Sequence, residues 1–470
     1  MQVQSMHFKA RASMKLADAR LQANLKKLSD KFVTARAAAV VELDDFEAIR
    51  SAAMQRRNRA IEHLDVWLDA FERNATARGA TVLYAESQEE ACRLIVEIGQ
   101  RHSASKAIKS KSMVSEEIGL NRALAAAGIQ PVETDLGEYI LQINDNEAPS
   151  HIIAPVIHKD KDEVSDLFAR THGTPRKTEI TELTGEARAV LRSHFLSADM
   201  GITGANFLIA ETGSVALVTN EGNEGMCTVM PPKVHVVLAG VEKVLPTLED
   251  LATLMRLLPR SATGQQISNY FSLLTGPRRP GEDDGPEHMY YVLVDAGRTG
   301  LIGGDFQDML RCIRCGACMN HCPVYQKIGG HAYGWVYPGP MGSVLTPSYV
   351  GLDKAIDLPH AATLCGQCQV VCPVKIPLPE LLRKLRERQV DRGLRPWTER
   401  AALMAWGWAA RNPSLYRAGS RLAARLLKWM GGARGRIRTL PLAGGWTDQR
   451  DFPAPSGRTF HELYRERQGR

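Results

Sequence analysis

The hydrophobic and polar positions change period along the chain. Up to about residue 76 they recur at helical spacing, as at Leu21, Leu25 and Leu28. From there to about residue 300, short apolar runs alternate with amphipathic stretches, a rhythm that predicts an α/β fold with a parallel or mixed sheet covered on both faces. Strands are expected at 80–85, 106–112, 130–143, 151–157, 207–210, 215–218 and 289–297, helices at 88–100, 115–128 and 175–196, and a further strand and helix within 231–258.

After Gly303 and Gly304 the pattern changes again. Residues 324–350 are rich in Gly, Pro and aromatics and are expected to wrap without regular elements. Helices are predicted at 376–393 and, as a Trp- and Arg-rich pair, within 397–430, followed by an extended arm. These changes divide the chain into a helical region (1–76), an α/β domain (77–300), a mostly helical cysteine-rich domain (301–395) and basic C-terminal helices with an arm (396–470).

Seven of the nine cysteines fall in two runs of the cysteine-rich domain. The first run, CIRCGACMNHCP from Cys312, has the spacing C-x2-C-x2-C-x3-C-P that holds cubane iron–sulfur clusters in two-cluster ferredoxins. The second, CGQCQVVCP from Cys365, matches the last three cysteines of the same pattern, and Ala362 stands where its first cysteine would be. The spacing therefore predicts two clusters held by two segments far apart in the sequence.

In ferredoxins of this kind the fourth cysteine of each run binds the other cluster. By this rule Cys312, Cys315, Cys318 and Cys372 complete cluster 1. Cluster 2 has only Cys322, Cys365 and Cys368, so it is either a [4Fe–4S] cluster with a different fourth ligand or a [3Fe–4S] cluster. The candidates for that ligand are the isolated thiol of Cys227 and three histidines near the runs in sequence, namely His321, His331 and His360.

Structural zinc and disulfide bonds are the two alternative uses of these cysteines. Structural zinc prefers two spaced pairs of ligands, whereas here four cysteines fall in one short run. Disulfides are disfavoured because a chain of 470 residues can build its own core without them. Thiols reserved for metal ligation point to a reducing compartment, and the N-terminus lacks the apolar core of a secretory signal, so a cytoplasmic protein is expected.

Charge is unevenly distributed. The net charge is +7, yet from Arg383 onward there are 20 Lys and Arg against 7 Asp and Glu, so the remainder (39 against 45) is acidic. A basic end of this kind suits an acidic partner, a membrane surface contacted peripherally, or simply a solvated helical face. No nucleic-acid-binding motif accompanies it, and no apolar run is long enough to span a bilayer.

The α/β domain offers polar residues where strands end. Lys109, Lys111 and Ser112 precede a predicted helix whose N-terminal N–H groups favour an anion, and Asn206, Glu211 and Asn220 lie around a glycine turn. They are the candidates for binding a carboxylate or phosphate, with Glu211 the one candidate for a catalytic group. The alternatives are a solvated loop for the lysines and a backbone-capping turn carboxylate for Glu211. No G-x-G-x-x-G or P-loop signals a nucleotide.

Two sets of residues together resemble one family. TGANFLIAETGSVALVTNEGN (203–223), KSKSMVSEEIGLNRAL (109–124) and VETDLGEYILQI (132–143) are similar to the LUD, or lactate-utilisation, domain. CIRCGACMNHCPVYQKIGGHAYGWVYPGPMG (312–342) and LCGQCQVVCPVKIPLPELL (364–382) resemble the ferredoxin-like half of the same iron–sulfur proteins. The resemblance implies an α/β domain like the CoA-transferase and isomerase class, and a complex with two companion proteins that oxidises L-lactate to pyruvate.

Three functions remain open at this stage. The first is an electron-transfer subunit of such a complex, in which the 2-hydroxy acid reacts on a partner. The second is a protein that binds a small carboxylate or acts as a scaffold, with structural clusters. The third is an oxidoreductase that uses the under-ligated iron of cluster 2 as a Lewis acid toward hydroxyl or carboxylate oxygens.

Overall fold

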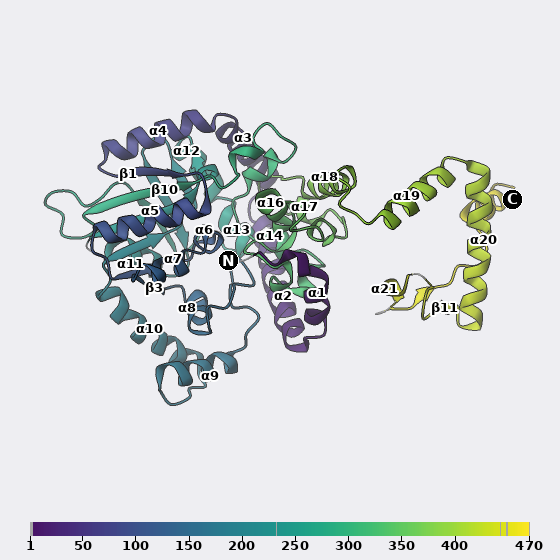
Figure 1. Ribbon diagram of the computed structural model, residues 1–470, viewed down its shortest axis with the longest axis horizontal. Helices are drawn as coiled ribbons and strands as arrows, with labels where there is room; N and C mark the ends of the chain where they lie inside the picture. Colours follow the sequence, from purple (N-terminus) through teal and green to yellow (C-terminus); the bar gives the residue numbers. More distant parts are fainter. Residues whose placement is uncertain (1–2, 232, 442, 448–449, 470) are drawn as a thin grey trace. The chain divides into compact units, whose positions relative to one another are not determined.

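The computed structural model describes residues 3–231, 233–441, 443–447 and 450–469 (Figure 1). The chain forms two compact units, residues 1–389 and 390–470. The first contains the α/β fold and the cysteine-rich segment, and the second contains the basic C-terminal helices.

A six-stranded parallel sheet organises the first unit. Its strand order is β1-β10-β7-β4-β2-β3, and every neighbouring pair is parallel, which confirms the α/β class. The central strand β7 is buried along its whole length, as expected of a strand covered on both faces. The strands are β1 (Thr81–Ala85), β2 (Lys106–Lys109), β3 (Gln130–Glu133), β4 (Met200–Thr203), β7 (Val234–Gly240) and β10 (His288–Val294).

Alternate residues of the strands enter different cores. On one face Val236 and Leu238 pack with apolar residues of α5, α6 and α7. On the other face Val237 packs with α4, while Ile108 packs with α8, α9 and α10. The covering helices are α5 (Gln88–Arg101), α6 (Met113–Ile118), α7 (Leu120–Ala126), α8 (Leu136–Ile143), α9 (Lys161–His172) and α10 (Ile180–Leu196).

A smaller four-stranded sheet, in the order β8-β5-β6-β9, extends this domain. The turn between β5 and β6 requires glycine at Gly213, where φ is +67° and a Cβ would lie 2.3 Å from the backbone nitrogen of Ala75 on α4. Its strands and the helices near it are β5 (Phe207–Ile209), β6 (Ser214–Thr219), β8 (Val244–Leu245), β9 (Tyr270–Leu274), α11 (Asn223–Val229), η2 (Val241–Lys243), α12 (Leu248–Met255) and α13 (Leu258–Ala262).

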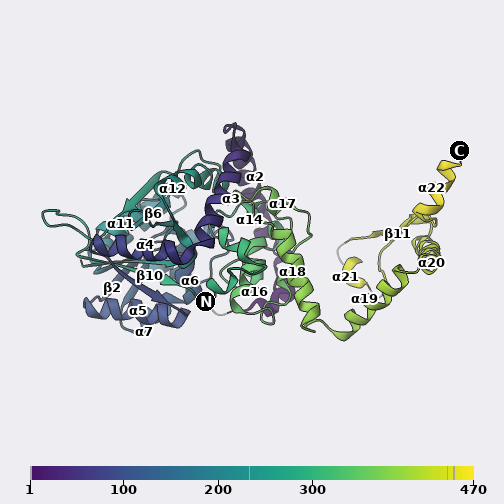
Figure 2. The same ribbon diagram turned by 90° about the horizontal axis from the view of Figure 1, so that it is seen from above.

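The N-terminal helices join the α/β domain to the cysteine-rich segment. Helix α2 buries Leu21, Leu25 and Leu28, and it contacts α15, while α3 contacts the turn that leads into the first cysteine run. The two views agree in showing α2 and α3 beside this segment (Figures 1 and 2). The helices are η1 (Ser5–His7), α1 (Phe8–Leu16), α2 (Ala19–Val41), α3 (Phe46–Glu62) and α4 (Leu64–Ala77).

The cysteine-rich segment is built from short helices. They are η3 (Thr299–Leu301), η4 (Gln307–Arg311), α14 (Ala317–Asn320), α15 (Tyr325–Ile328), η5 (His331–Tyr333), α16 (Gly339–Val350), η6 (Leu358–His360), α17 (Gln367–Val370) and α18 (Leu378–Asp391). The expectation that 324–350 forms no regular element was wrong. Pro340 lies in the first turn of α16, where its missing N–H costs nothing, so a Gly- and Pro-rich segment can still begin a helix.

Of two further predicted strands, one is shorter than expected and the other is absent. Only the first four residues of 130–143 form a strand, because Asp135 accepts the N–H groups of Gly137 and Glu138 and thereby starts α8. Residues 151–157 form turns instead of a strand. There His151 accepts N–H groups of Ile153 and Ala154 through Nδ1, which ties the backbone into a local turn.

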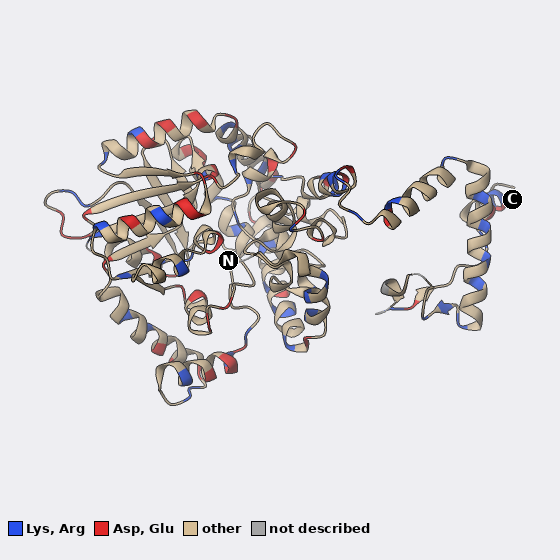
Figure 3. Cartoon of the chain, viewed as in Figure 1, with Lys and Arg blue, Asp and Glu red and all other residues tan. Residues whose placement is uncertain are grey.

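The second unit contains α19 (Trp397–Ala410), α20 (Pro413–Gly431), η7 (Gly432–Arg434), the β11 (Arg436–Ile437) and β12 (Phe452–Pro453) pair, α21 (Gly444–Thr447) and α22 (Phe460–Gln468). An ion pair of 3.1 Å between Arg421 and Glu462 joins α20 to α22, so the expected extended arm ends in a helix. Lys and Arg recur along α20 (Figure 3). Among the described helices, none combines the length and apolar character needed to cross a membrane.

Candidate metal centre and adjoining cavity

The two cysteine runs share one backbone conformation. Arg314, just before Cys315, has φ of +58°, and Gly316 has φ of +76°; Leu364 and Gly366 around Cys365 repeat this with +57° and +85°. Each loop then enters a four-residue helix, α14 or α17. The two loops therefore align with Cys315 on Cys365, as the spacing of the cysteines predicts. In this alignment the second run has no cysteine that corresponds to Cys312.

Four thiols line one small cavity. They belong to Cys312, Cys315, Cys318 and Cys372, and the other lining residues are mainly apolar. Burial, and after it the neighbouring thiol of Cys372, raise the pKa of Cys315 to about 12. Such thiols cannot all ionise together unless a cation compensates them, and a metal cluster supplies that compensation.

Backbone donors in the same region suit bound thiolates. The N–H of Arg314 donates to Cys312 Sγ at 3.5 Å, and the N–H of Ile376 donates to Cys372 Sγ at 3.4 Å. Hydrogen bonds of this kind are typical of cluster ligands and influence the reduction potential. The donor set, its apolar lining and these N–H groups fit an iron–sulfur cluster.

The other three cysteines of the runs also influence one another. Burial, followed by Cys322 and Cys365, raises the pKa of Cys368 to about 12. Cys322 is buried and Cys365 is exposed. The surface around Cys365 includes Leu364, which is 40% exposed, and Val370, which is 62% exposed. One set of thiols is thus enclosed, whereas the other reaches the surface of this unit.

The residues considered as a fourth ligand of this open set have other partners. Cys227 is buried on α11, with Sγ 3.3 Å from Thr134 Oγ1 in the α/β domain. His321 Nδ1 lies 2.9 Å from the Ala317 carbonyl, and His360 Nε2 lies 2.9 Å from Gln389 Oε1. These contacts do not single out one of the three side chains as the ligand of cluster 2.

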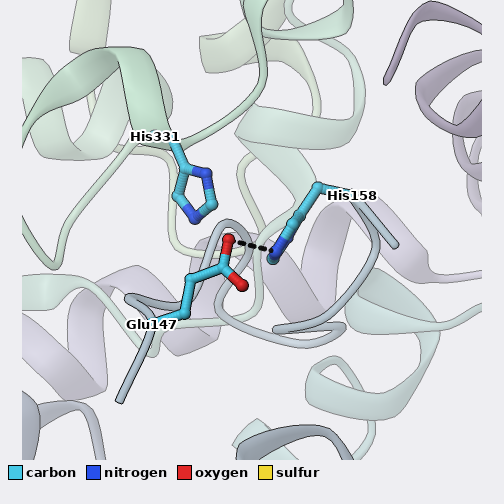
Figure 4. A group of neighbouring side chains, drawn as sticks. All are labelled: Glu147, His158 and His331. Carbon is cyan, nitrogen blue, oxygen red and sulfur yellow. Dashed lines mark ion pairs between the residues drawn. The ribbon is translucent and has the colours of Figure 1, made fainter. Parts of the chain in front are cut away.

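His331 lies in a different group of side chains. Figure 4 shows its ring beside Glu147 and His158, and the ligand atoms of the three lie within 4.8 Å of one another. Glu147 is already paired with His158 at 3.0 Å and with Lys159 at 2.7 Å. Glu147 therefore already has a cationic partner in Lys159.

A cavity of about 270 Å³ lies at the carboxyl ends of the parallel strands. Four of the six polar residues singled out from the sequence line it: Lys111, Ser112, Asn206 and Asn220. This is the position at which α/β sheets usually bind ligands. Ser112 also accepts the N–H of Ser115 and so caps α6, whose start lies two residues earlier than expected.

The other two residues do not line the cavity. Lys109 is fully buried and pairs with Glu133 Oε1 at 2.6 Å, so its charge is used inside the fold. Glu211 is exposed, and its Oε2 accepts the N–H of Leu248 at the start of α12 at 2.9 Å. Glu211 therefore caps the backbone at the start of α12, which is the alternative given for it above, and it does not face the cavity.

Sequence reasoning missed most of the cavity lining, including Glu224, Glu242, Lys243, Arg314 and Tyr337. The first three follow β6 or β7, so the rule that ligands bind at strand ends could have found them. Arg314 and Tyr337 come from the cysteine-rich segment, and no sequence signal brings them to this sheet. Their presence shows that the cavity adjoins the residues around the enclosed thiols.

Glu224 gives a testable dependence on pH. Burial raises the pKa of Glu224 from 4.5 to about 7, so the folded protein retains a proton that the unfolded chain releases. Its contribution to stability is present below about pH 4.5 and is lost as pH rises through about 7. Glu224→Gln should therefore gain stability relative to the wild type between about pH 5 and pH 8, by up to about 3 kcal/mol.

Unfolding midpoints of both proteins across this range measure the effect. Glu89→Gln, which changes an exposed carboxylate on α5, is the control and should follow the wild type. A Glu224→Gln protein that stays parallel to the wild type at every pH would show that Glu224 ionises normally.

Three segments of the chain match known protein families. Residues 68–294 match the LUD domain, residues 308–376 match the 4Fe-4S dicluster domain, and residues 383–469 match the C-terminal region of lactate utilisation protein B. A crystal structure of a DUF162 family protein from Deinococcus radiodurans covers 49% of this chain and 98% of that chain at 12% identity, with a TM-score of 0.27, a likeness too weak to support an argument.

Full-length relatives are more informative. Lactate utilization protein B of Bacillus licheniformis is 44% identical, over 99% of this chain and 98% of the relative. The protein of the same name from Geobacillus kaustophilus is 45% identical over 94% and 93%, and that of Lysinibacillus sphaericus is 42% identical over 99% and 98%. This identity over nearly the whole of both chains shows that the protein belongs to the lactate utilization protein B family.

Proposed function

We propose that this chain is the iron–sulfur electron-transfer subunit of a complex that oxidises L-lactate to pyruvate. The names of the relatives support the process, and the match to a 4Fe-4S dicluster domain supports the cofactor. The observation that carries the proposal is the interleaving of two distant cysteine runs, in which Cys372 of the second run joins three thiols of the first around one cavity.

The proposed ligand sets follow from that interleaving. Cluster 1 is held by Cys312, Cys315, Cys318 and Cys372, and cluster 2 by Cys322, Cys365 and Cys368. The domain boundaries proposed for these functions remain those inferred from the sequence, at about residues 76, 300 and 395.

Cubane clusters, when bound, accept and release single electrons over a wide range of potentials with little rearrangement. The residues of this chain keep water away from the cluster 1 site and hold the two cysteine runs in place. Apolar side chains such as Ile152 and Met341 exclude water from the cluster 1 site, and buried Arg50 donates to the Cys372 carbonyl at 2.7 Å, which fixes the second run against α3. The exposed surface at Cys365 offers a point of electron exchange with a partner.

The proposal includes two companion proteins that carry out the dehydrogenation, because oxidising a 2-hydroxy acid removes two electrons and two protons together. Two clusters in series can relay that pair. The basic second unit supports contact with an acidic partner or peripherally with a membrane surface, and no residue of α19 is buried. Thiols kept for metal ligation suit a reducing compartment, which favours the cytoplasm.

Anaerobic mixing tests the function. The oxidised protein is combined with both companion proteins, and L-lactate is added while visible absorption and EPR spectra are recorded. We expect bleaching of the iron–sulfur absorption, reversed by an added oxidant, and no bleaching if lactate or the companions are left out. Clusters that stay oxidised while lactate is consumed would show a structural role instead.

A further inference from the structure

We propose that the 270 Å³ cavity binds a small monocarboxylate with a hydroxyl or keto oxygen on the neighbouring carbon, held through its carboxylate by Lys243 and Arg314. The chemical class of the ligand rests on the proposed function, whereas the binding site is argued from the contacts below. The cavity would then bind the substrate or product of the companion proteins on the chain that carries the clusters.

Lys243 is the first observation. It lines the cavity and is only 6% exposed, yet among the described residues its Nζ makes neither a hydrogen bond nor an ion pair. Burying an ammonium group without a partner is costly, and buried lysines are normally paired. Lys109, which is equally buried in the same domain, follows that rule through its ion pair with Glu133. Lys243 therefore has a donor available for an anion.

Arg314 provides a second cation in the same cavity. Its guanidinium group stacks on Tyr337 at 4.6 Å, and its Nη2 is 3.6 Å from Glu242 Oε1, longer than a hydrogen bond. Glu242 Oε1 has no hydrogen-bond partner among the described residues, because the carboxylate is held by Arg298 through Oε2 at 2.9 Å. The guanidinium group thus keeps N–H donors that Glu242 does not use.

Several cations gather at the end of the cavity that Lys243 and Arg314 line, whereas Asp135, Glu221 and Glu224 also line the cavity. Four cations meet here, namely Arg57, Lys243, Arg298 and Arg314, and the carboxylates that face them are Glu117 and Glu242. Lys243 and Arg314 are the members of this group that line the cavity together with Glu242. A bound carboxylate would reach Lys243 without breaking a hydrogen bond or ion pair of that residue to the described part of the chain.

Other residues of the cavity suit the rest of such a ligand. Glu224 is 8% exposed and forms no ion pair within the part of the chain that the structure describes, and in its protonated form the carboxyl group can donate a hydrogen bond. Asn206 uses Oδ1 to accept the N–H of Val218 at 2.9 Å, which leaves its Nδ2 as a donor. A volume of about 270 Å³ lies just below the range of sites for drug-sized molecules, so a compact ligand is favoured.

The same cavity adjoins cluster 1. Arg314 contributes its side chain to the cavity and its backbone N–H to Cys312 Sγ at 3.5 Å. A ligand that draws the guanidinium group toward itself would change the electrostatic field at that sulfur. Binding should therefore be visible in the spectrum of the reduced cluster as well as in a titration.

Calorimetric titration of the full-length, cluster-loaded protein with pyruvate and with L-lactate tests the inference, with acetate and inorganic phosphate as comparison probes. We expect saturable binding of at least one of the two acids, tighter than that of either comparison anion. Lys243→Gln should weaken that binding about tenfold to a hundredfold, since a charge-assisted hydrogen bond is lost. Lys106→Gln is the matched control, because Lys106 lies at the other end of β2 and bonds Ser197.

Iron content and visible absorption verify that each variant is folded. If Lys243→Gln fails to fold, EPR spectra of the reduced wild type with and without pyruvate decide the question, and a shift of one cluster signal supports the site. Absence of saturable binding of both acids up to about 10 mM, well above common KM values, would overturn the inference. So would equal affinities for Lys243→Gln and the wild type, or tighter binding of phosphate.

The two proposals can fail separately. Clusters that are reduced by lactate through the companions, in a chain that binds neither acid, would leave the electron-transfer function and remove the cavity site. Binding that depends on Lys243, in a chain whose clusters stay oxidised, would keep the site and remove the electron-transfer function.

Discussion

Cys315→Ala is expected to remove cluster 1 and leave cluster 2 in place. The thiol of Cys315 lines the enclosed cavity with three other cysteines, and its loss leaves that set with three ligands in an apolar pocket that offers no replacement. Iron and acid-labile sulfide should fall to about half of the wild-type content, since each cubane cluster is a separate unit. Metal analysis and EPR of the reduced protein measure the loss.

Cys322→Ala is the matched variant, because this cysteine belongs to the same run but to the other ligand set. It should abolish the signal of cluster 2 and keep that of cluster 1. Cys92→Ala, which removes a half-buried thiol that bonds the Ile118 carbonyl, is the control and should retain all iron. If Cys315→Ala and Cys322→Ala remove the same signal, the crossed arrangement of ligands is incorrect.

Arg298→Met is expected to cost about 3–5 kcal/mol of unfolding free energy. Arg298 is completely buried and binds Glu117 at 2.8 Å and 3.0 Å and Glu242 at 2.9 Å. Removing the guanidinium group takes from Glu117 its cation and from Glu242 its nearest one, and losing one partner is the costly way to break a buried ion pair. Thermal and urea unfolding of the cluster-loaded protein under anaerobic conditions measure the change.

Arg93→Met is the control for this substitution. Arg93 also pairs with two carboxylates, Glu90 and Glu97, but on the exposed face of α5. Solvent screens that arrangement, so the unfolding midpoint should not change measurably. Arg298→Met with a midpoint like that of Arg93→Met would mean that the buried network contributes little to stability.

The Arg298 network also explains how the two parts of the first unit are joined. Glu117 lies on α6 and Glu242 follows β7, while Tyr337 of the cysteine-rich segment donates to Glu117 Oε2 at 2.5 Å. Arg57 of α3 extends the connection by donating to the carbonyl of Leu310 at 2.8 Å. Buried polar contacts thus fix the segment of the first cysteine run against the end of the parallel sheet.

Much of the fold could be predicted because it depends on local patterns. The run Val234–Gly240 is apolar apart from His235 and forms the central strand, and the periodic leucines of α2 form a buried helical face. Residues 136–143 are also largely apolar, but the cap formed by Asp135 outweighs their strand-like composition. A short apolar run does not by itself distinguish a buried strand from a buried helix.

The candidate site was predictable only where one segment determines it. The spacing of the cysteines indicates their ligand sets, and residues after β2 and β6 could be assigned to the ends of strands. Lys109 differs from Lys111 by two positions, yet one forms a buried ion pair and the other lines the cavity. Lys243 and Arg314 come together only through tertiary packing, which sequence spacing does not encode.

We propose that two segments of one chain interleave to hold two clusters close enough to exchange electrons. A potentiometric titration of the anaerobically purified protein, followed by EPR, is the decisive measurement. We expect signals from two iron–sulfur centres that broaden or split one another when both are paramagnetic. A protein that contains zinc in place of iron, or a single isolated centre at every potential, would rule this arrangement out.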